Sequence, residues 1–178
     1  MKTFFKGFCI GLLSLSLLGL LWFLVLQPGL TNREAQALKE EYAQPLPGEP
    51  SGELPAGKEQ AASLVNLSAL QAEYPDIKGW ISIPGTCVDY PVLQSSADEP
   101  EYYLRRTYKG EHRTAGSIFF QWDCSPESRN LIVYGHNMSD GTMFAVLQKM
   151  ADEAFRTEHS KILLQTSDGL REYRIAAV

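Results

Sequence analysis

Histidine is the side chain with the clearest catalytic potential in this sequence. His136 follows the apolar run 131–134 and Gly135, and the polar Asn137 comes directly after it. A strand end beside a loop gives a side chain both rigid support and access to solvent. Imidazole can take and give a proton near neutral pH, so His136 is a candidate general acid or base. Taken alone, a histidine in such a place is more often structural.

The other residues capable of chemistry lie in less informative settings. His112 and His159 have polar neighbours and are expected to be solvated. The three cysteines, Cys9, Cys87 and Cys124, form no CxxC pair, so neither a zinc site nor a dense disulfide framework is supported. The acidic residues show no calcium-loop spacing. We therefore expect no metal and no cofactor.

The elements that must position His136 follow from hydrophobic periodicity and from turn residues. Apolar residues at helical spacing predict helices over 64–74 and 143–150. Alternating or continuous apolar runs predict six strands, over 80–83, 87–93, 117–122, 131–134, 161–166 and 170–177. The run 131–134 is continuous and is expected to be central in the sheet. Ser167-Asp168-Gly169 is a strong hairpin signal. Since no strand–helix–strand alternation occurs, an antiparallel sheet or barrel is expected.

The N-terminal segment reads as a membrane anchor followed by a tether. Residues 8–26 form an uncharged apolar run of a length that spans a bilayer, and Lys2 and Lys6 precede it. The positive-inside rule then puts residues 1–7 in the cytoplasm and the rest outside the cell. A cleaved signal peptide, with Ala35-Gln36-Ala37 as its site, is the competing interpretation, although that site lies far past the run. Residues 27–60 are rich in Pro and Gly and predict an extracellular tether, within which 31–42 could be a short helix. The globular part then covers 61–178.

Composition narrows the class of partner. Hydrophobic residues make up 44% of the chain, which excludes wholesale disorder, and the formal net charge is −5. An acidic globular part without a basic patch argues against nucleic acid as a partner.

Several stretches, in order and in spacing, resemble class B sortases, the membrane-anchored cysteine transpeptidases of Gram-positive bacteria. The histidine segment reads Tyr-Gly-His-Asn-Met at 134–138, followed by Asp-Gly-Thr-Met-Phe at 140–144. The segments 75–86 and 88–94 are similar to the first strands of that family. The segments 102–104 and 115–120 are similar to the next recognisable sequence segments of the family. The resemblance runs from about residue 64 to residue 178 and includes the anchor.

The resemblance implies a fold that is mainly β with helices, an incomplete sortase-type barrel with about six of eight strands. An N-terminal helix and a transmembrane helix would precede it. It also implies a cysteine thiolate that cleaves the C-terminal sorting signal of a secreted protein through a thioester, which an amine of a cell-wall precursor or a pilin lysine then resolves. His136 would be the general acid and base, and Tyr134 and Leu104 would lie near the substrate groove or, as the alternative, pack in the core.

One departure from the family pattern is serious. The family's nucleophile lies in a Thr-x-x-Cys motif downstream of the histidine, and an arginine follows it; no such motif occurs in this sequence. None of Cys9, Cys87 and Cys124 lies at the position of the family nucleophile. Arg171 and Arg174 both precede the position of the family arginine. We therefore expect a sortase fragment truncated before these two groups, and as given inactive. The alternative is a membrane-tethered remnant or a module that binds sorting signals.

Overall fold

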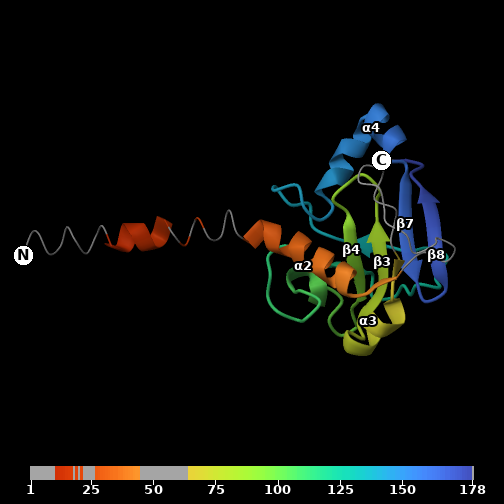
Figure 1. Cartoon of the computed structure of the whole chain (residues 1–178), viewed down its shortest axis with the longest axis horizontal. Helices are drawn as coiled ribbons and strands as arrows, with labels where there is room; N and C mark the ends of the chain where they lie inside the picture. Colours follow the sequence, from red (N-terminus) through yellow and green to blue (C-terminus); the bar gives the residue numbers. More distant parts are fainter. Residues whose placement is uncertain (1–10, 18, 20, 22–26, 45–63, 178) are drawn as a thin grey trace, which may run out of the picture.

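The structure is a computed structural model that describes residues 11–17, 19, 21, 27–44 and 64–177. Its centre is a six-stranded sheet in the order β6-β5-β4-β3-β7-β8, of which Figure 1 labels β4, β3, β7 and β8. The strands are β3 (Ile77–Ser82), β4 (Asp89–Gln94), β5 (Ile118–Phe120), β6 (Val133–Tyr134), β7 (Lys161–Thr166) and β8 (Gly169–Arg174). Among these described strands β6 and β8 form the two edges, so the sheet does not close into a barrel. The predicted incomplete barrel agrees with this arrangement.

Two hairpins form in the sheet, and the second has the turn that the sequence predicts at Ser167-Asp168-Gly169. The turn between β3 and β4 has Gly85 at a φ of 75°, and the Ile83 amide donates to the Val88 carbonyl at 2.9 Å. The turn between β7 and β8 has Gly169 at a φ of 125°. A positive φ carries little steric cost for glycine, so both turns are specified locally.

The sheet is mixed rather than antiparallel, which corrects one expectation. β4 and β5 pair in parallel, with Val92 opposite Ile118 and Gln94 opposite Phe120. A parallel pair needs a long crossover, and residues 95–117 supply it, including the 3-10 helix η2 (Tyr102–Arg105). The run 131–134, expected to be central, contributes the edge strand β6 instead.

The short helices follow the predicted positions with shifted bounds. Helix α3 covers Leu67–Glu73, and the side chain of Asn66 caps it by accepting from the Ala69 amide at 3.1 Å. The chain just before it, Leu64–Val65, is the strand β2, which pairs with β1 (Ala43–Gln44). The predicted helix over 143–150 is the 3-10 helix η3 (Ala145–Ala151), and α4 (Glu153–Glu158) follows it.

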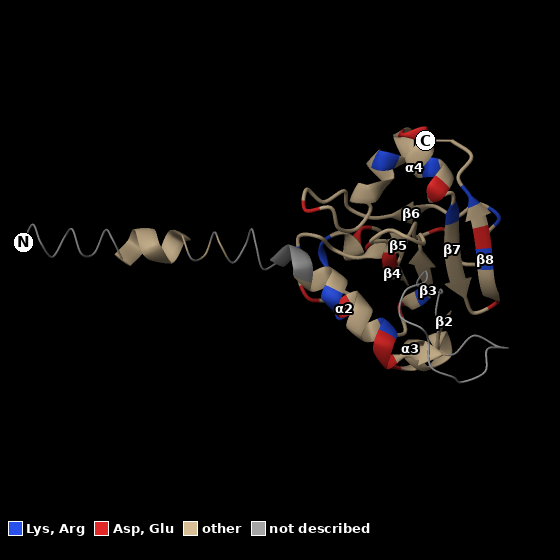
Figure 2. Cartoon of the chain, turned by 45° about the horizontal axis from the view of Figure 1, so that its top comes forward, with Lys and Arg blue, Asp and Glu red and all other residues tan. Residues whose placement is uncertain are grey.

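Helix α2 (Gln27–Glu41) lies on the domain and carries both acidic and basic side chains (Figure 2). Lys39 pairs with Asp89 of β4 at 2.7 Å, and Glu34 pairs with Arg113. Residues 27–44 thus belong to the folded unit, where the sequence predicted the start of a tether. Pro and Gly content suggested a tether, but most of the prolines and glycines of 27–60 fall at 45–60, outside the described residues.

Two hydrophobic clusters lie on opposite faces of the sheet. Alternation along β5 shows this, since Ile118 and Phe120 belong to one cluster and Phe119 to the other. Helix α2 contributes to both, through Ala35 and Leu38, which are 4% and 3% exposed.

No helix within the described ranges is long and apolar enough to cross a membrane. Much of the predicted anchor at 8–26 lies outside those ranges.

Candidate active site

His136 lies two residues after β6, at the edge of the sheet, as the sequence predicts. Its carbonyl accepts from the Phe144 amide at 2.9 Å, and the neighbouring Asn137 forms a β-bridge with Met143. Residues 137–143 are therefore a closed loop whose two ends meet beside the histidine. The loop fixes the backbone that carries the imidazole.

Gly135 explains how this backbone fits against the sheet. A Cβ at residue 135 would lie 2.3 Å from Cδ1 of Ile118 and 2.7 Å from Cδ2 of Phe144. Only glycine leaves space for these side chains, so the histidine strand packs tightly against β5.

The imidazole of His136 is half-buried and has an unusual electrostatic environment. Burial lowers the pKa of His136, and the positive charge of Arg105 lowers it further. Its Nδ1 atom is buried and has no hydrogen-bond partner among the described residues. A neutral ring with a free nitrogen is suited to accept a proton or to orient a second reactive group.

Tyr134 and Leu104 line the same surface hollow, of about 350 Å³. The other residues lining it are Pro100, Glu101, Phe119, Gln121 and Trp122. The Tyr134 hydroxyl donates to Oε1 of Gln121 at 2.9 Å, and its ring lies 5.5 Å from that of Phe119, centroid to centroid. Tyr134 is 44% exposed, so it is not a core residue. His136 is absent from the described residues that line this hollow.

The described thiols make contacts of their own. Cys87 Sγ donates to the Gly141 carbonyl at 3.1 Å, and Cys124 Sγ to the Asn130 carbonyl at 3.5 Å. Burial raises the pKa of the Cys87 thiol, which disfavours the nucleophilic thiolate. Within the described ranges, no group of His, Cys, Asp and Glu side chains could hold a metal ion.

Two residues differ from what the sequence suggested. His159 is not solvated: its side chain is 11% exposed, Nδ1 lies 3.0 Å from the Pro84 carbonyl, and the ring packs on Phe155. Arg105 acts on His136, which sequence reasoning missed. The two are far apart in the chain, so no local pattern could have revealed this electrostatic interaction.

Comparisons with known proteins bear on this site. The sortase domain family model matches residues 81–178. Sortase B of Listeria monocytogenes is 41% identical over 111 residues, which is 61% of this chain and 44% of that protein. Sortase B of Staphylococcus aureus is 34% identical over 111 residues, 61% of this chain and 45% of that protein.

A crystal structure of sortase B from Bacillus anthracis is 35% identical, covers 80% of this chain and 62% of its own, and superimposes with a TM-score of 0.60. The chain spans about half the length of the curated relatives it matches, 44% and 45%. The family model covers more than half of the chain, and the relatives are sortases B. The chain therefore belongs to the sortase family, and within it to class B.

Proposed function

We propose that this protein works as a sortase-type cysteine transpeptidase in which His136 is the general acid and base. The observation that carries the proposal is the position of His136: it follows an edge strand, is half-buried, has a lowered pKa and has a buried Nδ1 without a partner among the described residues. The family membership supports the reaction class. The hollow lined by Tyr134 and Leu104 is the proposed binding site of the sorting signal.

The proposed reaction has two steps. A cysteine thiolate attacks a carbonyl carbon of the sorting signal, the C–N bond breaks, and His136 gives a proton to the leaving amine. An acceptor amine, from a cell-wall precursor or a pilin lysine, then attacks the thioester. His136 takes the proton of that amine, and the thiolate leaves. By the family resemblance the nucleophile belongs to a Thr-x-x-Cys motif, which this sequence lacks, and Cys87 and Cys124 contact other groups.

The test uses the protein as its natural gene makes it and a fluorogenic sorting-signal peptide. His136→Ala should reduce cleavage by about 10²–10⁴-fold, the usual contribution of general acid–base catalysis. The matched control is His112→Ala, because His112 is an exposed histidine of the same domain. His112→Ala should keep nearly full activity. If His136→Ala also kept more than about a tenth of the wild-type activity, the assignment of His136 would be wrong.

A second function is a membrane-tethered module that binds sorting signals without cleaving them. The absence of a Thr-x-x-Cys motif from this sequence and the hollow beside Tyr134 favour it. In that case the peptide should bind without turnover, and Tyr134→Ala should weaken its binding in a fluorescence anisotropy titration. Turnover of the peptide by the natural gene product would exclude this alternative.

The proposal includes a single-pass topology, with residues 1–7 in the cytoplasm, 8–26 in the membrane and the rest outside. Lys2 and Lys6 before the uncharged run support it. An alkaline phosphatase fusion after Gln60 should be active. An inactive phosphatase there, with an active cytoplasmic reporter at the same site, would contradict the topology.

A further inference from the structure

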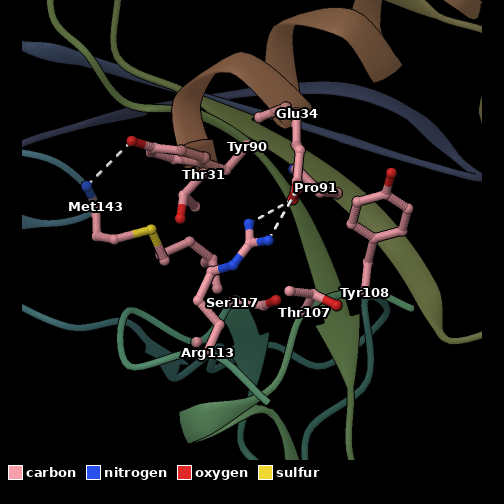
Figure 3. A pocket seen from close by; sticks show the side chains of 12 residues that line it. Thr31, Glu34, Tyr90, Pro91, Thr107, Tyr108, Arg113, Ser117 and Met143 are labelled. Carbon is pink, nitrogen blue, oxygen red and sulfur yellow. Dashed lines mark hydrogen bonds and ion pairs between the residues drawn. The ribbon is translucent and has the colours of Figure 1, made fainter. Parts of the chain in front are cut away.

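The hydroxyl of Tyr90 connects helix α2 to the loop that follows His136. Tyr90 lies on β4, and its hydroxyl accepts a hydrogen bond from the Met143 amide at 3.0 Å (Figure 3). The same hydroxyl donates to Oδ1 of Asn32 on α2. A single buried oxygen thus contacts the N-terminal helix and the histidine loop.

Met143 is the point at which the loop is most constrained. It is the one non-glycine residue with a positive φ, 56°, among the described residues, and its side chain is only 1% exposed. L-residues adopt this backbone conformation only when their surroundings hold them there. The Tyr90 hydroxyl supplies the partner for the Met143 amide, which would otherwise be a buried donor without an acceptor.

The constraint at Met143 passes to His136 through two short connections. Met143 forms the β-bridge with Asn137, the residue next to His136, and the adjacent Phe144 amide donates to the His136 carbonyl at 2.9 Å. A shift of the Met143 backbone therefore displaces both ends of the loop that holds the imidazole.

Helix α2 fixes the direction of the Tyr90 hydroxyl. Tyr90 is 2% exposed, and burial holds its pKa well above the ordinary value, so the hydroxyl keeps its proton. Because that proton is given to Asn32, an oxygen lone pair is left for the Met143 amide. The paired Glu34 and Arg113 hold the same turn of α2 against the crossover segment 95–117 (Figure 3).

We propose that Tyr90 is a positioning residue for His136, and that Asn32 of helix α2 orients it for that role. The link from α2 to the loop stands on contacts within the chain, and only its meaning for catalysis rests on the proposed function. The N-terminal helix is then part of the apparatus that places the histidine and not merely a spacer.

The first experiment measures hydrogen exchange over residues 137–144 of the full chain, in mild detergent. Tyr90→Phe keeps the ring and removes the hydroxyl, so the Met143 amide should exchange about tenfold faster. The matched control is Tyr103→Phe. Tyr103 is also buried, at 3% exposed, and its hydroxyl donates to Asp76 at 2.5 Å, in the other hydrophobic cluster. Its loss should leave exchange over 137–144 unchanged.

The second experiment follows His136 itself, through the pH dependence of its carbethoxylation mapped by mass spectrometry. The exposed His112 is the internal reference. In Tyr90→Phe the ring becomes more hydrated, so His136 should react several-fold faster and its pKa should rise toward the ordinary value. Arg105, the charged group that acts on His136, is the same in both proteins.

A third pair of variants tests the part played by α2. Asn32→Ala should change exchange and carbethoxylation in the same direction as Tyr90→Phe. Gln36 lies one turn further along the helix, and its side chain donates to Asp89 at 3.3 Å. Gln36→Ala should change neither the exchange nor the carbethoxylation. This pair also serves if Tyr90→Phe does not fold.

Unchanged exchange at 137–144 and an unchanged His136 profile in both Tyr90→Phe and Asn32→Ala would overturn the inference. So would equal changes in Tyr90→Phe and Tyr103→Phe, since that would mean a general loss of stability. Neither readout needs turnover, so a failure of the proposed transpeptidase function would leave this result intact.

Discussion

Burial and the charge of Arg105 both favour the neutral form of His136. At neutral pH the ring is therefore a base, which in the proposed reaction would accept the proton of the incoming amine. A cysteine thiolate placed beside it would act in the opposite direction, since a negative charge stabilises the imidazolium and raises the pKa. The protonation state of His136 would thus depend on whether a thiolate lies beside it.

The lowered pKa of His136 makes stability depend on pH in a definite direction. The unfolded chain binds a proton at the ordinary value of 6.5, above the pKa in the folded state, so between the two the unfolded state binds more protons. The free energy of unfolding should therefore be unaffected above that ordinary value. It should fall as pH drops through it, and level off below the lowered pKa.

Urea denaturation at a series of pH values measures this effect. His136→Gln should remove the loss of stability that this group causes in mild acid. His112→Gln should keep it, because His112 is an exposed histidine away from this site. A wild-type curve that matched the His136→Gln curve over this range would contradict the prediction.

Gly135→Ala tests how tightly the histidine strand is packed. The new methyl group would overlap Ile118 and Phe144, at 2.3 and 2.7 Å, so we expect a loss of about 1–3 kcal/mol of stability. Because Cδ1 of Ile118 makes the closer contact, Ile118→Val should relieve part of the overlap. The double variant should then be more stable than the two separate losses predict, and simple additivity would count against the packing argument.

Helix α2 shows how an element can dock through a few charged contacts. The Glu34–Arg113 pair is bidentate, with one N–O distance of 2.8 Å, and the Arg113 side chain is only 14% exposed. The hairpin pair Lys161–Glu172 has a similar separation, 3.0 Å, but both side chains are largely exposed, at 53% and 42%. Partial burial and fork geometry should make the first pair the stronger one.

Charge-neutralising variants compare the two pairs directly. Glu34→Gln should lower the free energy of unfolding by about 1 kcal/mol, and Glu172→Gln by less than about 0.5 kcal/mol. High salt should reduce the loss in Glu34→Gln less than the loss in Glu172→Gln, because the Arg113 side chain is shielded from solvent. Thermal or urea unfolding measures both; equal losses would mean that α2 is not held by this contact.

Local signals explain which elements were predictable. The hairpin turns at Gly85 and Gly169 need glycine at a positive φ, which the sequence displays directly. The capping by Asn66 is local too. The parallel pairing of β4 with β5, the edge position of β6 and the docking of α2 are set by contacts between residues far apart in the chain. Hydrophobic periodicity and the residues that favour turns carry no information on such long-range contacts.

The same division holds for the candidate site. His136 stands at a strand end within a recognisable motif, and the structure places it there. Tyr134 and Leu104 line one hollow, although their role in binding stays a prediction. The link from Asn32 through Tyr90 to Met143 joins three distant segments, and each residue alone has an ordinary polar or core setting.

At the scale of the whole molecule, the described sheet has two edges of different character. β8 is six residues long, and it carries Arg171, Glu172 and Arg174, charges that discourage pairing with another chain. β6 has only two residues, Val133 and Tyr134, and its outer side bears no strand among those described. The histidine is thus attached to the less protected edge, where an added strand would lie beside it.

The folded unit extends to the N-terminal side of residue 61, because α2 closes both hydrophobic clusters. Leu38 is 3% exposed in one cluster and Ala35 is 4% exposed in the other. A protein that starts at residue 45 would lose both side chains and the ion pairs of Lys39 and Glu34. Burial of a leucine alone contributes about 1.5–3 kcal/mol, a large part of the ~5–15 kcal/mol that a domain has in total.

We therefore predict that residues 45–178 unfold at a much lower temperature than 27–178, and bind more of a dye that reports exposed apolar surface. A point variant separates the packing of α2 from chain length. Leu38→Ala in 27–178 should cost about 2–5 kcal/mol, or roughly 4–20 °C in Tm. The adjacent Ala37 faces solvent, so Ala37→Ser on the same helix should shift Tm by no more than about 2 °C. Equal melting of 27–178 and 45–178, or of Leu38→Ala and Ala37→Ser, would show that α2 rests on the domain without stabilising it.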